Sequence, residues 1–327
     1  MFDCDRLLKG DRRALARAIT LVEDDDPQAR AIIRAIYPHT GRAHVIGITG
    51  APGYGKSTLV NAIARVYRQR GLTVGVVAVD PTSPFTGGAL LGDRVRMRDL
   101  AGDPGVFIRS MASRGYLGGL ARATAEVVLI LDAAGYQRIL VETVGVGQAE
   151  VDIARTAHTT VVVQAPGMGD EVQAIKAGIL EIADVFAINK ADQDGVERTE
   201  ATLQMLLSMS AASAATSGRE PTWAPPIVRP VGPRGVGVAD HVDALEALAI
   251  TQPATGRWQT RERARAAFTL HELLRDELMA RLLACLPHDL LDTFLERIAN
   301  RQIDPYAAVV ALLAAVGPLA PCGPAGG

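Results

Sequence analysis

Between residues 44 and 248, short apolar runs alternate with longer segments whose apolar positions recur with the period of a helix. The apolar runs predict strands at 44–49, 73–79, 106–108, 138–141, 159–164, 185–188 and 227–229. The periodic segments predict helices at 56–69, 117–134, 170–182, 197–215 and 239–248. Strands that alternate with helices in this way form a mostly parallel sheet covered by helices on both faces. We therefore expect an α/β fold.

Helical patterns flank this region on both sides. Residues 1–38 carry a rough helical stripe, and the acidic run 23–26 followed by Pro27 is suited to close one helix and open the next. Helical periodicity returns from Arg257 and breaks at Pro287. The chain is thus expected to have an N-terminal helical extension over 1–40, an α/β domain over 41–250 and a C-terminal helical region over 251–327.

The C-terminal helices carry more apolar surface than a single chain needs. Residues 307–316 are all apolar, and a second apolar helix face is expected from Leu273, Leu274, Leu278, Leu282 and Leu283. A helix that is apolar all round must be covered on every side. We expect a homodimer interface here, with an intrachain helical cap as the alternative. Ten residues are too few to cross about 30 Å of hydrocarbon as a helix, so no membrane partner is expected.

Composition and charge narrow the possible partners. The chain has 327 residues, and 34 Lys+Arg against 36 Asp+Glu give a net charge of −2, which does not favour nucleic acid or anionic lipid. Aromatic residues make up only 4%, which weakens any base-stacking role. The three cysteines, Cys4, Cys285 and Cys322, lack metal-ligand spacing. Their separation favours a reducing, cytoplasmic location.

A glycine-rich loop from Gly50 to Ser57 is the strongest chemical signal. It matches G-x-x-x-x-G-K-[ST] and lies between a predicted strand and a predicted helix. Backbone N–H groups of such a loop, together with the helix dipole, form an anion site. Lys56 is expected to reach the β- and γ-phosphates, and the Ser57 hydroxyl to ligate Mg²⁺. The nucleotide-binding residues expected in this segment are Gly50, Gly53, Tyr54, Gly55, Lys56, Ser57 and Thr58.

A second motif predicts which base is bound. Asn189, Lys190 and Asp192 form N-K-x-D directly after the predicted strand 185–188. An Asp carboxylate in this place can accept the N1–H and N2 amine of guanine, whereas adenine offers neither donor. The later serine-alanine reader of many G proteins has no clear counterpart. The segment 230–232 leaves a backbone contact to the guanine carbonyl open.

Three carboxylates are expected around a metal ion. Asp80 and Glu142 follow predicted strands, and Asp93 lies in a glycine-rich loop. Ligands of open α/β sheets bind at the carboxyl ends of the strands, and carboxylates hold Mg²⁺ directly or through its waters. We assign the metal site to Ser57, Asp80, Asp93 and Glu142, and catalytic roles to Lys56, Asp93 and Glu142. For each acidic residue the alternative is a helix cap. The Gly145 N–H is expected to contact the γ-phosphate.

Taken together, the motifs resemble the MeaB/ArgK family of G-protein chaperones. The motifs that carry the resemblance are 47–58, 78–81, 86–94, 115–120, 142–148, 166–171 and 189–192. The resemblance implies a P-loop GTPase domain over 41–250 that binds GTP, GDP and Mg²⁺. It also implies a homodimer with slow intrinsic turnover that is stimulated by an adenosylcobalamin-dependent acyl-CoA mutase. Hydrolysis would gate cofactor loading, protection or reactivation of that mutase. The stretch 166–184 corresponds to a mobile switch, with Lys176 a contact to the mutase.

Other functions remain open at this point. A kinase-type ATPase of amino-acid transport would need ATP, which the guanine motif disfavours. A nickel-insertion GTPase tends to carry His/Cys sites, whereas the six histidines here are scattered. A nucleotide-bound scaffold that never hydrolyses GTP is a further alternative. Candidate charge stabilisers are Arg94, Arg109 and Arg114, and Gln148 is a candidate for positioning water. Which mutase is the client is not specified.

Departures from the family pattern are few. Tyr54 is bulky for its place in the phosphate loop, and Pro84 and Phe85 are apolar where the family is usually polar.

Overall fold

The computed structural model describes residues 2–80, 98–100, 102–112, 119–143, 149–167, 177–216, 224–254 and 256–316. Two compact units form within the chain, residues 1–265 and residues 266–327, and the division falls inside helix α12.

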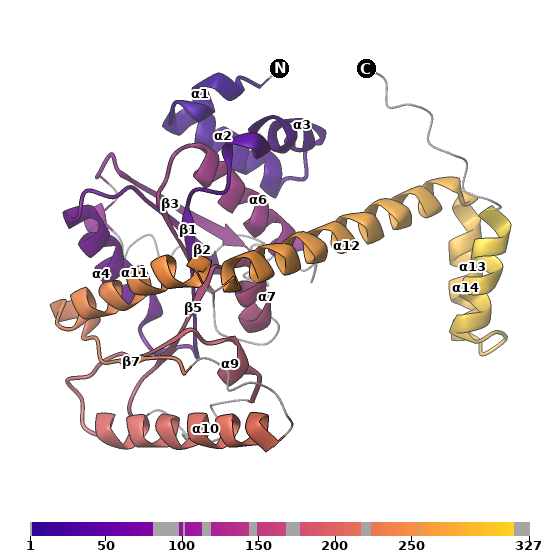
Figure 1. Cartoon of the computed structure of the whole chain (residues 1–327). Helices are drawn as coiled ribbons and strands as arrows, with labels where there is room; N and C mark the ends of the chain where they lie inside the picture. The colour runs from indigo at the N-terminus through magenta and orange to yellow at the C-terminus, as the bar shows by residue number, and fades with distance from the viewer. Residues whose placement is uncertain are drawn as a thin grey trace. The chain divides into compact units, whose positions relative to one another are not determined.

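A seven-stranded sheet forms the centre of the first unit (Figure 1). Its strands are β1 (His44–Thr49), β2 (Val74–Asp80), β3 (Val106–Ala112), β4 (Arg138–Glu142), β5 (Thr159–Gln164), β6 (Val185–Ile188) and β7 (Ile227–Val228). They lie in the order β3-β2-β4-β1-β5-β6-β7, and every neighbouring pair is parallel. All seven strands predicted from apolar runs are present, which confirms the α/β fold.

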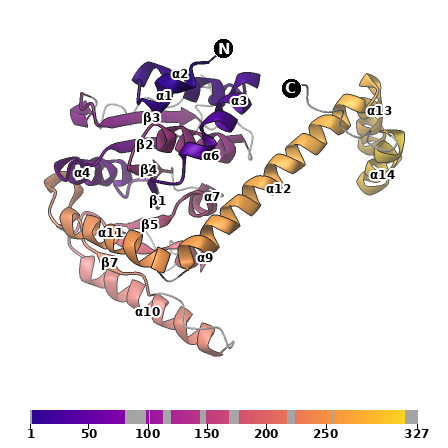
Figure 2. The same cartoon turned by 45° about the horizontal axis from the view of Figure 1, so that its top comes forward.

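Helices cover both faces of this sheet, as predicted. The helices that alternate with the strands are α4 (Lys56–Gln69), α6 (Gly119–Ala133), α7 (Ala149–Thr156), α9 (Ala177–Ile182), α10 (Val196–Thr216) and α11 (Val238–Ala254). Alternate residues of one strand reach opposite faces. Val45 of β1 joins a cluster with α2 and α6, whereas Ile46 and Ile48 join a cluster with α4 and α11. Figure 2 shows α6 and α11 on opposite sides of the strands.

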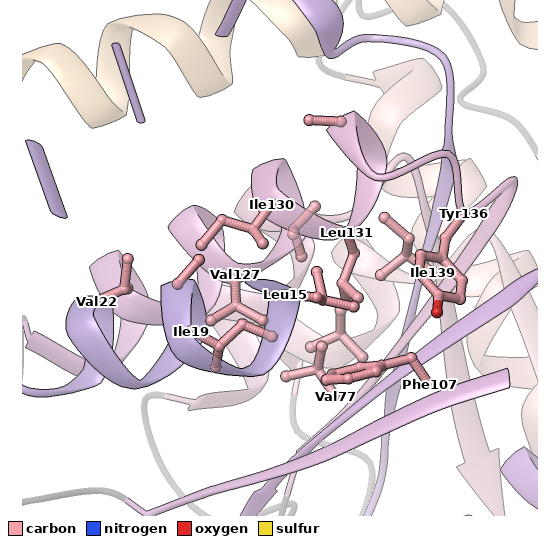
Figure 3. Close-up of a cluster of buried hydrophobic side chains, with 14 of the residues drawn as sticks. Leu15, Ile19, Val22, Val77, Phe107, Val127, Ile130, Leu131, Tyr136 and Ile139 are labelled. Carbon is pink, nitrogen blue, oxygen red and sulfur yellow. The ribbon is translucent and has the colours of Figure 1, made fainter. Parts of the chain in front are cut away.

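The N-terminal helices share a hydrophobic core with the sheet. They are α1 (Cys4–Leu8), α2 (Arg12–Glu23) and α3 (Pro27–Ile36). Leu15 and Ile19 of α2 pack with Val127 of α6 and with Val77 and Phe107 of the sheet (Figure 3). Burial of such side chains stabilises the fold by roughly 1.5–3 kcal/mol each. The extension is therefore part of the first unit's core.

The predicted helix break at the acidic run is confirmed. Helix α2 ends at Glu23, and the Asp26 side chain accepts a hydrogen bond from the Gln28 N–H, as an N-cap does. Pro27 occupies the first turn of α3, where its missing N–H is not needed.

Three elements differ from the prediction, namely β3, α7 and α11, which continues to Ala254, beyond the predicted end at 248. The helix predicted at 170–182 lies partly outside the described residues, and its described part is α9. Strand β3 pairs with β2 as far as Ala112, beyond the predicted end at 108. The apolar run stops at Ile108 because the next residue is the charged Arg109, which is paired with Glu23 of α2. Helix α7 was not predicted, since it has only 8 residues and little apolar periodicity. Its Ile153 packs so closely on β1 that a Cβ on Gly47 would lie 2.5 Å from Ile153 Cγ1.

The start of helix α12 (Arg257–Cys285) is anchored to the sheet at the amino ends of β1 and β5. The Trp258 ring stacks on His158 with centroids 3.9 Å apart. Arg261 donates to both carboxylate oxygens of Asp184 at 2.6 and 2.7 Å, and the Asp184 side chain is fully buried. Such a two-pronged pair fixes orientation as well as contact. This anchor lies wholly within the first unit.

The second unit contains the remainder of α12, then α13 (His288–Ala299) and α14 (Pro305–Val316). The break at Pro287 is confirmed, because this residue is the N-cap of α13. Phe294 and Ala308 are buried, whereas Val310 and Leu278 are 67% and 45% exposed. Among the described residues, no helix is both long enough and apolar enough to cross a membrane.

Buried histidines should make the fold sensitive to acid. Burial lowers the pKa of His44 to about 3 and that of His241 to about 4. The unfolded chain takes up these protons below about pH 6.5, whereas the folded chain does not, so stability falls as the pH falls. Between pH 7.5 and 5.5 we expect a loss on the order of 1 kcal/mol for each of these two histidines.

Urea unfolding at the two pH values measures this loss. His241→Leu should remove the contribution of one histidine to the pH dependence of the free energy of unfolding. The matched control is His271→Leu, at an exposed position, which should leave that pH dependence unchanged. An unfolding free energy that stays constant over this pH range would contradict the prediction.

Candidate functional site

The predicted site residues that the structure describes gather at the carboxyl ends of β1, β4 and β6. Gly50 follows β1 with a φ of 138°, and a Cβ there would lie 2.3 Å from the Val163 carbonyl oxygen of β5. Only glycine fits this close approach of backbone to backbone. The loop that begins at Gly50 is therefore held against the edge where ligands of open α/β sheets bind.

The phosphate loop ends where helix α4 begins, at Lys56. Gly53 and Gly55 have φ values of 85° and 82°, which other residues rarely adopt. The buried Lys56 ammonium donates to the carbonyls of Gly50 at 2.7 Å and of Ala51 at 3.1 Å. A buried cation and a helix N-terminus thus lie at the same loop, which favours an anionic ligand.

Oxygen ligands meet beside this loop. The Ser57 hydroxyl donates to Glu142 Oε1 at 2.7 Å, and both side chains are buried. Glu142 ends β4, which pairs with β1 so that Glu142 lies opposite Ile48. Next to them Thr143 donates to the Thr49 hydroxyl at 3.1 Å. Carboxylate and hydroxyl oxygens are the donor set that Mg²⁺ prefers.

Asn189 ties the base motif to the phosphate loop. Its side chain is 1% exposed and donates to the carbonyls of Tyr54 at 2.9 Å and Gly55 at 3.2 Å. Its Oδ1 accepts the Gly232 N–H at 3.2 Å. A buried amide with three partners is well satisfied. This side chain thereby joins the base motif to the phosphate loop and to the turn at Gly232.

The next residues of the base motif lie at the surface. Lys190 adopts a φ of 58°, and its ammonium donates to the Gly53 carbonyl at 2.9 Å. Asp192 forms an ion pair with Arg234, with 3.5 Å between Oδ2 and Nη2. Arg234 lies in the turn η3 (Gly232–Arg234). A carboxylate and a guanidinium are therefore paired at the end of the base motif.

Two features of the phosphate loop bear on the expectations from the sequence. The Tyr54 side chain is buried in the core cluster that also contains Leu59. Only the backbone of this bulky residue therefore lines the phosphate loop. Thr58 packs beside Gly232, with its Cγ2 3.4 Å from the place of a Cβ there.

Several predicted residues lie outside the described part of the chain. They are Asp93, Gly145, Arg94, Arg114, Gln148, Lys176 and the pair Pro84 and Phe85. Asp80 ends β2, as predicted, but only its backbone is described. Arg109 is paired with Glu23 and donates to the Thr20 hydroxyl, so it is engaged with α2 and not with the phosphate loop.

Arg234, the ion-pair partner of Asp192, was not predicted from the sequence. It follows Gly232 and Pro233, in the segment where many G proteins carry a serine-alanine reader. A basic residue in that segment is the signal that could have identified it. The described residues contain no cluster of three or more His, Cys, Asp or Glu side chains that could hold a metal ion.

The chain is similar to known proteins over most of its length. A family model described as methylmalonyl-CoA mutase-associated GTPase MeaB matches residues 15–286. A Pyrococcus abyssi protein named as a GTPase is 48% identical over 309 residues, which are 94% of either chain. The mitochondrial methylmalonic aciduria type A homolog of Mus musculus is 32% identical over 84% of this chain and 68% of its own. The crystal structure of an LAO/AO transport system kinase matches with a TM-score of 0.68 and 29% identity over 95% of both chains.

The bonds of Asn189 should matter for nucleotide affinity. Asn189→Ala removes three hydrogen bonds and leaves two loop carbonyls without their donor. We expect the affinity for GDP to fall by about 10- to 100-fold. Each lost buried hydrogen bond costs roughly 1–3 kcal/mol, and water that enters the space restores part of that free energy. Displacement of a fluorescent GDP analogue measures this. Gln193→Ala, an exposed neighbour, is the control, and equal affinities of the two variants would refute the tethering role.

Proposed function

The chain belongs to the MeaB family of GTPases, and from this premise we propose that it is a chaperone of an adenosylcobalamin-dependent acyl-CoA mutase. GTP hydrolysis would gate cofactor loading, protection or reactivation of the mutase. The description of the matching family as mutase-associated supports this partner. The observation that supports a nucleotide-binding site is the buried side chain of Asn189, which joins the phosphate loop to the base motif.

The phosphate side of the site follows from the loop. We propose that the nucleotide phosphates are bound by Gly50, Gly53, Tyr54, Gly55, Lys56, Ser57, Thr58 and Gly145. The Lys56 ammonium would exchange its two carbonyl partners for β- and γ-phosphate oxygens. Its charge offsets the negative charge that builds up as the bond to the γ-phosphate breaks, and burial strengthens that interaction.

The base side rests on the N-K-x-D motif. Asp192 would accept the N1–H and N2 amine of guanine, with Asn189 and Lys190 placing the loop around the base.

We assign Mg²⁺ to Ser57, Asp80, Asp93 and Glu142. Among these, the side chains of Ser57 and Glu142 are described, and their buried oxygen pair fits the ion. The ion would screen the phosphate charges and orient the γ-phosphate for attack by water. Glu142 also orients the Ser57 hydroxyl, so it would keep that ligand aimed at the metal.

The C-terminal region, 251–327, is proposed to hold the homodimer together. The second unit exposes apolar side chains that a second copy would cover, namely Leu270, Leu274, Leu278, Met279, Leu283, Leu295, Val309, Val310 and Leu313. Closed twofold dimers are the commonest solution to such a face. We also propose a cytoplasmic location, since Cys4 and Cys285 are free thiols.

A second candidate function comes from the name of one solved relative, the LAO/AO transport system kinase. A kinase of that kind would use ATP, whereas Asp192 favours guanine.

Stimulation of GTP turnover by a client mutase tests the proposal directly. The purified chain is assayed for phosphate release alone and with methylmalonyl-, isobutyryl-, ethylmalonyl- or 2-hydroxyisobutyryl-CoA mutase. We expect one of them to raise the rate at least about tenfold, which corresponds to roughly 1.4 kcal/mol of barrier. Lys56→Ala should abolish turnover in both conditions, and Glu142→Ala should lower Mg²⁺-dependent turnover more than GDP affinity. If none of the four mutases changes the rate, the chaperone assignment is wrong.

Light scattering tests the dimer. We expect a mass near 69 kDa, twice the chain mass of 34.5 kDa. Removal of residues 266–327 leaves the Trp258 and Arg261 anchor in place and should give a monomer. Leu278→Asp should weaken the dimer because it places a charge in an apolar interface, whereas Asp276→Asn on the same helix should not. A full-length chain that is monomeric at micromolar concentration excludes the interface.

A further inference from the structure

We propose that the Arg234 side chain reads the 6-oxo group of guanine and thereby sets the base specificity of the site. This inference rests on the proposed role of Asp192 as reader of the N1 and N2 donors. It assigns a donor to the 6-oxo group, the remaining hydrogen-bonding group on the Watson–Crick edge of guanine.

The backbone of the turn that precedes Arg234 is already engaged. The Gly232 N–H donates to Asn189 Oδ1 at 3.2 Å, and Pro233 has no N–H. The other N–H groups of the described turn close bonds within it, from Val231 to Val236 and from Arg234 and Gly235 to Val231. The segment in which a backbone contact to the base had been left open therefore has its donors occupied.

The Asn189 tether fixes this arrangement. If the Gly232 N–H turned to the base, it would leave Asn189 Oδ1, a buried acceptor, without that bond. Such a loss costs about 1–3 kcal/mol. The close packing of Gly232 against Thr58 and Leu59 also holds the turn in place. A side-chain donor that is free to move is therefore the better reader.

Arg234 has the required position and chemistry. Its Nη2 lies 3.5 Å from Asp192 Oδ2, and its side chain is 68% exposed, so it can adjust when a base enters. In guanine the 6-oxo group is next to N1–H, so a donor beside the Asp192 carboxylate reaches it. Guanidinium groups bind guanine O6 in many complexes because their N–H groups match oxygen acceptors.

This arrangement favours guanine and disfavours adenine. With guanine, the carboxylate meets two donors and the guanidinium meets an acceptor. Adenine presents an amine where guanine has its oxygen, so the guanidinium would face a donor while Asp192 loses its N1–H partner. Unpaired polar groups are the main source of strong rejection in binding sites.

The test compares GDP with 6-thio-GDP, in which sulfur, a weak acceptor, replaces the 6-oxo oxygen and the N1–H and N2 donors remain. The full-length chain should bind GDP better than 6-thio-GDP. Arg234→Ala should lower GDP affinity about tenfold, as expected for loss of a charged hydrogen bond, and 6-thio-GDP affinity less than twofold. The GDP affinity of Arg234→Lys should lie between that of the unmodified chain and that of Arg234→Ala. The control is Arg229→Ala, which removes another exposed arginine of the same segment, paired with Glu200, and should change neither affinity.

Inosine diphosphate separates this role from an indirect effect on Asp192. It keeps the 6-oxo group but lacks the N2 amine, so Arg234→Ala should weaken it by the same factor as GDP. A loss that is equal for GDP and 6-thio-GDP, or no loss at all, overturns the assignment to Arg234.

Asp192→Asn reports separately on the proposed guanine site. A shift of preference toward xanthosine diphosphate supports that site, because an amide can donate to the 2-oxo group. If Arg234→Ala has no effect while this shift occurs, only the inference about Arg234 fails. If Asp192→Asn changes no nucleotide preference, the guanine site and the inference both fall.

Discussion

The buried side chain of Asn189 is the interaction on which the rest of the site depends. It holds the carbonyls of Tyr54 and Gly55 with its amide N–H groups and the turn at Gly232 with its oxygen. The phosphate loop, the base motif that contains Asn189 and the turn at Gly232 lie far apart in the sequence, and they follow β1, β6 and β7 of one parallel sheet. A loop that binds phosphate and a loop that reads a base can act as one site only if the distance between them is fixed. A fully bonded amide in a buried place provides that fixed distance.

The two edges of the sheet have different tasks. At the carboxyl edge, glycines, the Lys56 ammonium and the Ser57–Glu142 pair favour anions and a hard metal ion. At the amino edge, His158, Trp258 and the Arg261–Asp184 pair hold the first turns of α12. Binding chemistry and the attachment of the C-terminal helices are therefore separated by the length of the strands. A change at one edge can leave the bonds of the other intact.

The fold was largely predictable because its strands are buried and apolar. In β1, β5 and β6 every residue faces the interior, so the apolar run and the strand have the same bounds. In β3 the Arg109–Glu23 pair replaces an apolar contact, and the sequence pattern ended the strand too early. Lys56, Ser57 and Asn189 were predicted from motifs and Glu142 from its place after a strand, and the structure brings all four to one edge of the sheet. The pairing of Arg234 with Asp192 was not predicted, since it depends on how the turn after β7 folds.

The central claim is that one site binds phosphate and selects guanine. Titration calorimetry of the nucleotide-free, full-length chain with GDP and with ADP, each in the presence of Mg²⁺, measures this selectivity directly. The account predicts that GDP binds at least about 100-fold more tightly, since adenine leaves the Asp192 carboxylate without donors. Equal affinities for GDP and ADP would contradict it.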